Sequence, residues 1–585
     1  MFDLVITHAT LIDGTGTERR QADVAIHDGR IAAVVDVDPN GSGPDWEAAS
    51  TIDARGSIVT PGWVDVHTHY DGQVSWDDRL DPSAGHGVTT VVTGNCGVGF
   101  APVRPGSEDW LVQLMEGVED IPGAALSEGI AWGWEHFGEY LDAIGSRHYA
   151  MDVATQIAHG PVRGYVMGER GASNEPATED DIAAMARIVR EAVEAGAVGF
   201  STSRTLGHVA RDGRPVPGTF AEPAELFGIA DAMAATGRRV VFEAAQGGLT
   251  MLDRGSTVDE LGWMSEVARR TGLPVSYILL QTDATPDHWR EVLAAADSAD
   301  VGDGSLWAQI AARPFGMLIS LGTNHPFLKR PSYVEVANLP VAERAAAMSD
   351  PARRARILAE DDLPPDPSIA FDGIGGFLAA VLDKLFPLGD TPDYEPTPDR
   401  AVTALAEAAG EDPLAFVYDR LVGGDGDAMF LLPLFNYSHG DHEAIREMLT
   451  APGTISGLGD AGAHCGMICD ASIPTYLLTH WARDRTRGLR LRLEDLVRKQ
   501  TLDTASLYGL TDRGVVAVGK RADLNVIDLD GLALRAPRIV YDLPAGGRRI
   551  VQDAVGYRST IVAGQVVTAN GVDTGARPGR LVRGV

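Results

Sequence analysis

Both ends of the chain alternate apolar and polar residues with a period of two. Such runs open the sequence in DLVITHATLIDG, ADVAIHDGRIAAVV and STIDARGSIVTPG, and they return near its end in ADLNVIDLD and STIVAGQVVTANG. Gly, Asp and Asn residues separate the runs. Because this period places every second side chain on one face of a strand, both ends predict short β-strands joined by turns.

Between these ends, short apolar runs alternate with longer alanine-rich stretches. TTVVTG, VATQIAHG, AVGFSTS, RRVVFEAA, LPVSYILL and GTISGLGD have the composition of buried strands, whereas EDDIAAMARIVREAVEAG and PAELFGIADAMAATG have helical spacing. Strand–helix alternation over this length predicts parallel βα units in an α/β fold. Eight such units would close a TIM-like (β/α)8 barrel.

Residues 322–430 interrupt this alternation. The segment is rich in Pro, Asp and charged helical patches, including SDPARRARILAEDDLPPDPS. We interpret it as an insertion that caps the barrel mouth or, alternatively, as a surface helical excursion without a catalytic role.

Charge and composition narrow the classes of partner. The 585 residues include 49 Lys and Arg against 82 Asp and Glu, a formal net charge of −33. So acidic a surface repels nucleic-acid backbones and anionic lipid heads, so neither nucleic acid nor membrane is an expected partner. No apolar run approaches the roughly 20 residues that span a bilayer, and no signal-peptide pattern opens the sequence, so we expect a cytoplasmic protein. The sequence does not indicate an oligomeric state.

His67 and His69 are the first candidate metal ligands. They lie in PGWVDVHTHYDG, at the end of an apolar β run. Residues i and i+2 of a strand point to the same face, so the two imidazoles converge. Neutral imidazole binds zinc and similar ions, and a barrel presents the carboxyl ends of its strands to its active site.

Cys96 and Asp460 follow two other β runs. Cys96 enters a Gly-rich turn in TTVVTGNCGVGF and could bind a metal as a thiolate, although a free cysteine is more often a buried apolar residue. Asp460 ends GTISGLGD, where a carboxylate could bind a metal and accept a proton from an activated water. The alternative for Asp460 is the cap of a following helix.

Over most of its length the chain resembles the D-aminoacylase (N-acyl-D-amino-acid deacylase) family of the amidohydrolase superfamily. The motifs that carry the resemblance, in order, are VTPGWVDVHTHYDG, GVTTVVTGNCGVGFAPV, IAHGPVRG, GAVGFSTS, LFNYSHGD, ISGLGDAGAH, VRKQTLDTASLYGLTDRGVVAVGKRADLNVID and TGARPGR. The resemblance implies a TIM-like barrel over residues 58–505 and a small β-sandwich built from residues 1–57 and 506–585.

The resemblance also implies roles for the candidate residues. His67, His69 and Asp460 correspond to one half of the family's metal site. Cys96 corresponds to its thiolate ligand, and Asp460 to its general base.

The chain departs from the family's metal site at two positions. Where the family supplies two further histidines, Glu243 and Leu279 stand in RRVVFEAAQG and LPVSYILLQT. Glu243 could replace one imidazole as an oxygen ligand, or it could orient a ligand without touching the metal. Leu279 cannot bind a metal. We therefore expect one divalent ion, zinc in the first instance, rather than two.

The substrate side departs as well. The family holds its substrate's carboxylate with a lysine, a tyrosine and an arginine, where this chain carries Gln281, Phe315 and the run ASIPTYLL. Losing these donors removes the charge-assisted hydrogen bonds that a free carboxylate needs. We expect an uncharged, larger or cyclic amide rather than a simple N-acyl-D-amino acid.

Several other residues are assigned supporting roles. His159 and Arg163, in IAHGPVRG, are expected to support the ligands, and Gln281 and His464 to support them or contact substrate.

The remaining histidines and thiols that follow β-like runs have simpler interpretations. His208 and His325 could enter a rearranged metal site, but ordinary hydrogen-bonded histidines are the simpler account. Cys465 and Cys469 are interpreted as structural.

Together these features predict a hydrolase that cleaves the C–N bond of a small-molecule amide. A divalent metal polarises the carbonyl, and Asp460 takes a proton from water and passes it to the leaving nitrogen. Two alternatives stay open. The same site could cleave an ester, a lactone or a cyclic imide, since each passes through a tetrahedral oxyanion. The missing histidines would also fit a catalytically silent homologue that acts as a binding protein.

Overall fold

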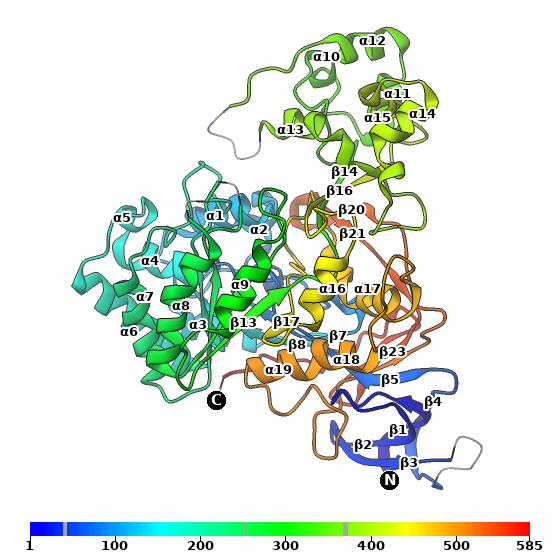
Figure 1. The fold of residues 1–585 in the computed structure, drawn as a ribbon. Coiled ribbons are helices and arrows are strands. Elements are labelled where there is room, and N and C mark those ends of the chain that lie inside the picture. Colours follow the sequence, from blue (N-terminus) through cyan, green and yellow to red (C-terminus); the bar gives the residue numbers. More distant parts are fainter. Residues whose placement is uncertain (39–43, 251, 254, 367–371, 585) are drawn as a thin grey trace.

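The structure, a computed structural model, describes residues 1–38, 44–250, 252–253, 255–366 and 372–584. It has three visible parts (Figure 1): a body of parallel strands and helices, a mixed β-sheet near the N-terminus, and a helical lobe at the opposite end.

Two parallel sheets form the centre of the body. One has the order β17-β13-β12-β11-β10-β9 and the other the order β6-β7-β8. Their strands are β6 (Trp63–Asp65), β7 (Val88–Thr93), β8 (Asp152–Thr155), β9 (Ile157–Ala158), β10 (Gly199–Ser203), β11 (Val241–Ala245), β12 (Pro274–Ile278), β13 (Ser305–Ile310) and β17 (Thr454–Ser456). Each apolar run predicted to be a strand in this region overlaps one of them.

The two parallel sheets are connected at both edges. Gln156 alone separates β8 from β9, so these strands are one extended run of chain that pairs with β7 on one side and β10 on the other. At the opposite edges, Thr68 after β6 forms a parallel bridge with Ala461 after β17.

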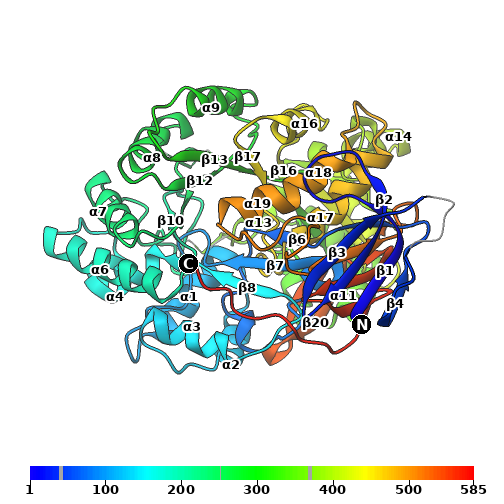
Figure 2. The ribbon, with the colours of Figure 1, turned by 90° about the horizontal axis from the view of Figure 1, so that it is seen from below.

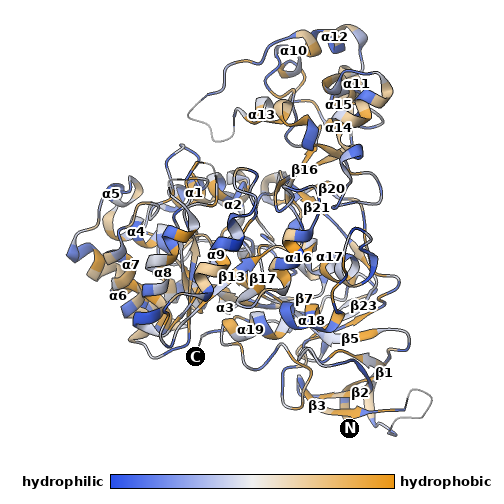
Figure 3. Cartoon of the chain, in the orientation of Figure 1, coloured by the Kyte–Doolittle hydropathy of each residue, from blue (hydrophilic) through white to orange (hydrophobic). Residues whose placement is uncertain are grey.

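Helices cover the outer side of these strands (Figure 2). They include α6 (Glu179–Ala195), α7 (Pro223–Ala234), α8 (Thr257–Thr271) and α9 (His288–Asp297). Helix α6 begins at Thr178, whose hydroxyl accepts a hydrogen bond from the Asp181 backbone and so satisfies a free N–H of the first turn. Its buried residues include Met185, Val189 and Val193, spaced four apart on the face toward the strands. Figure 3 shows polar residues beside apolar ones on the outer helices.

Strands from both ends of the chain join in one nine-stranded sheet. Its order is β25-β24-β23-β18-β5-β1-β2-β3, with β4 paired to β1. The strands are β1 (Phe2–Leu11), β2 (Arg20–His27), β3 (Arg30–Asp36), β4 (Ala48–Asp53), β5 (Ile58–Pro61), β18 (Leu524–Ile527), β23 (Tyr557–Val562), β24 (Gln565–Ala569) and β25 (Val572–Asp573). The antiparallel pairing of β5 with β18 joins the two ends. The predicted terminal strands are thus confirmed, whereas the sandwich and the domain boundaries stay predictions.

The segment that interrupts the alternation forms the lobe. It leaves the body after β14 (Phe315–Ser320) and returns through β16 (Met429–Phe435), which pairs antiparallel with β14. The lobe has its own apolar cluster, which includes Phe327, Met348 and Tyr418. Its helices are α10 (Pro331–Val334), α11 (Val341–Met348), α12 (Pro351–Ala359), α13 (Ile374–Ala380), α14 (Val402–Ala409) and α15 (Pro413–Leu421). The lobe projects from the body (Figure 1), and a role in capping stays a prediction.

Across the part of the chain that is described, no helix is long and apolar enough to cross a bilayer.

Candidate active site

His67 and His69 lie just beyond the carboxyl end of β6 and are both 1% exposed. The Nδ1 of His67 lies 2.8 Å from Oε1 of Gln309, on β13. The amide nitrogen of Gln309 donates to the Ser276 hydroxyl at 2.9 Å, so its oxygen is left to accept from His67. His67 therefore carries its proton on Nδ1 and presents the lone pair of Nε2 to the site.

Three other donor atoms gather around that lone pair. The Cys96 Sγ and the Asp460 Oδ1 each lie 3.3 Å from Nε2 of His67. The Nε2 of His69 lies 3.7 Å from the same Asp460 oxygen. Burial lowers the pKa of His67 to about 4 and that of His69 to about 3. Both imidazoles are thus neutral near pH 7, the state in which they bind metals.

Cys96 is held in place by a tight turn after β7. Its φ is 55°, and Gly94, two residues earlier, packs so closely that an added Cβ would lie 2.2 Å from the Gln156 carbonyl oxygen. The Cys96 N–H donates to Glu243 Oε2 at 3.1 Å. Burial, reinforced by nearby carboxylates, raises the pKa of the Cys96 thiol well above its ordinary value. A bound cation would reverse this preference and deprotonate the thiol.

Glu243 points from the middle of β11 into the same cluster. It is fully buried, and its Oε1 has no hydrogen-bond partner among the described residues. Burial raises the pKa of Glu243 to about 8. A buried carboxylate oxygen without a partner is costly unless a proton or a cation satisfies it. Leu279, just past β12, is buried and offers only an apolar side chain.

Glu119 is a carboxylate that sequence reasoning missed. It ends α1 (Glu108–Glu119) and is 1% exposed, with Oε1 3.4 Å from His69 Nδ1 and Oε2 3.7 Å from His464 Nε2. Burial, together with the charge of Asp460, raises its pKa well above the ordinary value. No motif distinguishes Glu119, because it lies in a helix rather than at a strand end.

Asp460 reaches the cluster through an unusual backbone. Its φ is 41°, in the left-handed region, and the next residue, Ala461, bridges to Thr68 between the two histidines. This bridge fixes the carboxylate over both imidazoles. His464, four residues later, packs edge-on against Phe315, with ring centroids 6.5 Å apart.

His159 and Arg163 belong to a separate buried network. The His159 ring contacts Thr202 Oγ1 at 2.9 Å and Glu225 Oε1 at 2.8 Å, and Arg163 Nη1 lies 2.6 Å from both Glu225 oxygens. These contacts use both ring nitrogens of His159. None of these contacts is with the cluster around His67.

Gln281 uses its side chain on the backbone. Its Nε2 donates to the Pro286 carbonyl at 3.1 Å, and its Oε1 accepts from the Ser438 N–H at 3.1 Å. The amide therefore joins the end of β12 to the loop after β16.

The remaining candidates are His208, His325, Cys465 and Cys469. His208 contacts the Ser203 hydroxyl at 2.9 Å, and His325 accepts from the Phe327 backbone at 3.2 Å inside the lobe. Cys465 and Cys469 are buried free thiols.

The donor set fits a divalent metal. Ligand atoms of His67, His69 and Cys96 all lie within 4.8 Å of one another, and Asp460, outside that group of three, places an oxygen near both histidines. Nitrogen, sulfur and oxygen donors in this combination suit zinc. Glu243 adjoins this group through the hydrogen bond of its Oε2 to the Cys96 backbone, and its other oxygen has no hydrogen-bond partner among the described residues.

Residues 50–568 match the model of the Amidohydrolase family. D-aminoacylase from Alcaligenes xylosoxydans xylosoxydans is 36% identical over 210 residues, which are 36% of this chain and 39% of that protein. N-acyl-D-glutamate deacylase from the same organism is 27% identical over 592 residues and covers 99% of this chain and 96% of its own.

Solved structures give the same picture of the fold. A D-aminoacylase described as having a binuclear metal centre has a TM-score of 0.64 at 23% identity over 100% of both chains. N-acyl-D-glutamate deacylase from Bordetella bronchiseptica, complexed with zinc and a phosphonate inhibitor, has a TM-score of 0.62 at 24% identity, over 100% of this chain and 99% of that one. At identities of 23% and 24%, these similarities are evidence for the fold alone.

Proposed function

Because this chain belongs to the amidohydrolase family and is a hydrolase of carbon–nitrogen bonds other than peptide bonds, we propose that it is a zinc-dependent deacylase of a neutral small-molecule amide. The observation that carries the proposal is the convergence of His67 Nε2, Cys96 Sγ and Asp460 Oδ1, with both Sγ and Oδ1 3.3 Å from that nitrogen.

His67, His69, Cys96 and Asp460 would hold one zinc ion. The zinc in the structure of the related N-acyl-D-glutamate deacylase supports this choice of metal. When bound, the ion supplies a Lewis acid that polarises the scissile carbonyl and acidifies a water molecule. The Gln309 hydrogen bond keeps the His67 lone pair aimed at the ion.

Asp460 is the proposed general base. Its Oδ1 lies against both imidazoles, and the left-handed backbone at this residue fixes its direction. The carboxylate takes the proton of the attacking water and delivers it to the leaving nitrogen, so that one group serves as base and then as acid.

Glu243 is the proposed additional oxygen donor. The Cys96 N–H holds one of its oxygens and leaves the other without a partner. Since Leu279 supplies no donor at the neighbouring strand, the set supports one ion rather than two.

The substrate proposed is an uncharged, larger or cyclic amide. Gln281 is engaged with backbone groups, and Phe315 packs against His464 and offers no hydroxyl. These two positions provide no cation or hydroxyl for a free carboxylate.

We also propose that the parallel strands close into a (β/α)8 barrel. The order from β6 to β17 counts eight strands when β8 and β9 are taken as one, and the bridge from Thr68 to Ala461 supports closure. The cluster then lies at the carboxyl ends of the strands, where barrels carry their active sites.

The test is hydrolysis of paired substrates by zinc-loaded protein. N-acyl amino-acid amides are compared with the matching free acids and esters, for the wild type and Asp460→Asn. We expect turnover of the amide by the wild type and a loss of at least about 100-fold in kcat with Asp460→Asn. If only the ester bond of the ester substrates is hydrolysed, the enzyme is an esterase rather than an amidase. If none of the substrates is hydrolysed, the catalytically silent homologue is favoured.

A further inference from the structure

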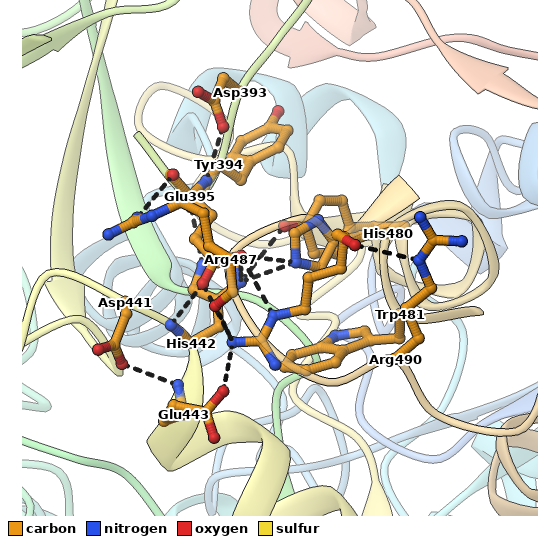
Figure 4. A network of polar contacts seen from close by, with 12 residues as sticks. Asp393, Tyr394, Glu395, Asp441, His442, Glu443, His480, Trp481, Arg487 and Arg490 are labelled. Atoms are coloured by element: carbon orange, nitrogen blue, oxygen red, sulfur yellow. Dashed lines mark hydrogen bonds and ion pairs between the residues drawn. The ribbon is translucent and has the colours of Figure 1, made fainter. Parts of the chain in front are cut away.

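A second group of metal-binding side chains lies outside the candidate active site (Figure 4). It brings together Glu395, His442 and His480, whose ligand atoms all lie within 4.8 Å of one another. They come from three separate segments: the chain returning from α13 toward α14, the residue before α16 (Glu443–Thr450), and a π-helical turn over Leu477–Asp484.

The tautomer of His442 is fixed by its surroundings. Its Nε2 lies 2.8 Å from the Tyr394 carbonyl oxygen, which can only accept. The proton therefore sits on Nε2, and Nδ1 presents a lone pair to the group. That lone pair faces His480 Nε2 at 3.3 Å and Glu395 Oε2 at 3.8 Å.

His480 is placed by packing. Its ring stacks on Tyr476, with centroids 4.7 Å apart and planes at 11°. This stacking directs its Nε2 to 3.0 Å from Glu395 Oε2. Without a cation, the Nε2 proton of His480 points to the carboxylate, and the Tyr476 hydroxyl, 3.4 Å from His442 Nδ1, is the other donor within reach of that lone pair.

The spacing of the three atoms suits one tetrahedral ion. Zinc bonds to nitrogen and oxygen of about 2.0–2.2 Å place neighbouring ligands about 3.3–3.5 Å apart. The three separations here, 3.0, 3.3 and 3.8 Å, bracket that value. We propose that Glu395, His442 and His480 form a second binding site for zinc or a similar divalent transition-metal ion, independent of the one at His67.

The rival arrangement is an ion pair without a metal. Arg485 Nη2 lies 3.2 Å from Glu395 Oε1 and 2.8 Å from Glu443 Oε1, so its charge is shared between two carboxylates. Glu395 Oε1 also accepts from the His442 N–H at 2.9 Å. The arginine thus contacts both Glu395 oxygens, because its Nε also lies 3.3 Å from Oε2, the oxygen that faces the histidines.

A metal here would join the stretch of the lobe between α13 and α14 to the body. Tyr394, beside Glu395, packs under Arg313 with its ring 4.1 Å from the guanidinium carbon, and Arg313 lies 2.5 Å from Asp470. Metal binding would therefore add its free energy to the attachment of this segment. Oxygen and nitrogen donors without sulfur distinguish this site from the one that contains Cys96.

The test is zinc binding in a full-length background with the first site removed. His67→Ala/Cys96→Ser is compared with the same chain carrying His480→Gln, and with a matched control carrying His439→Gln, since His439 is half-exposed and contacts Asp287 instead. Each chain is stripped with chelator and titrated with zinc, and its fold is checked by circular dichroism.

We expect about one zinc equivalent in the background and in the His439 control. We expect His480→Gln to weaken zinc binding by more than about 100-fold. Loss of a residue that only supports a metal ligand typically costs up to about 100-fold. Equal binding with and without His480, or no zinc in the background, would overturn the proposal. If His480→Gln fails to fold, cobalt titration of the wild type decides: a second equivalent without a thiolate absorption band supports the site, and its absence refutes it.

Discussion

The His67 ring donates its Nδ1 proton to the side-chain oxygen of Gln309, across 2.8 Å inside the body. Replacing Gln309 with Leu removes the acceptor that fixes this tautomer. We expect zinc affinity to fall by about 10–100-fold, measured by competition with a chelator. The matched control is Gln246→Leu, another buried glutamine, which bonds to the Ile278 backbone. Equal losses of zinc affinity in both variants would point to a packing effect. Gln309 would then have no role in orienting His67.

Glu243→Gln keeps the shape of the side chain but removes its charge. The pKa of about 8 for Glu243 results from burial, and a cation at the free oxygen would favour the ionised form. We expect zinc affinity at pH 7 to fall by about 10-fold or more, measured by isothermal titration. An unchanged Kd would mean that Glu243 does not bind the metal and serves only to accept the hydrogen bond from the Cys96 N–H.

Gln281→Lys tests the expectation of a neutral substrate. The substitution introduces the lysine of the resembled family but breaks the contacts to Pro286 and Ser438. We expect a loss of about 1–3 kcal/mol in unfolding free energy, because the part-buried Ser438 N–H loses its acceptor, and no gain on free N-acyl amino acids. Increased kcat/KM for the free acid would contradict the expectation of a neutral substrate.

Glu225→Gln tests the buried network with His159 and Arg163. Although burial alone would raise it, the contacts with His159 and Arg163 hold the pKa of Glu225 below its ordinary value of 4.5. A lowered folded-state pKa means that the ionised group stabilises the fold above pH 4.5 and that this contribution is lost as the pH falls through the folded pKa. At pH 7 we expect a destabilisation of about 3–5 kcal/mol, since Arg163 loses its partner in the interior.

Urea unfolding of the wild type and Glu225→Gln over pH 3–7 measures this difference. The gap between them should narrow below pH 4.5. A gap independent of pH would mean that shape, rather than charge, sets the contribution of Glu225.

The candidate metal ligands could be found from the sequence because each follows a strand. His67, Cys96 and Asp460 stand where an apolar β run ends, and parallel strands bring those ends together. Glu119 and Gln309 could not be found in this way. Glu119 reaches the site from the end of a helix, and Gln309 matters through a single tertiary hydrogen bond that no local pattern encodes.

The same limit applies to the substrate side and to the second group of ligands. Gln281 was expected near ligand or substrate, and its backbone contacts depend on how the loop after β16 packs. Glu395, His442 and His480 lie far apart in sequence with no shared spacing, so only the fold brings them together.

The most direct measurement is amide hydrolysis by chelator-treated protein before and after zinc is added, for the wild type and His67→Ala. The account predicts no turnover by the stripped wild type, recovery with zinc, and no recovery by His67→Ala at the same zinc concentration. Hydrolysis that proceeds without metal, or recovery by His67→Ala to the wild-type rate, would contradict a catalytic metal held at His67.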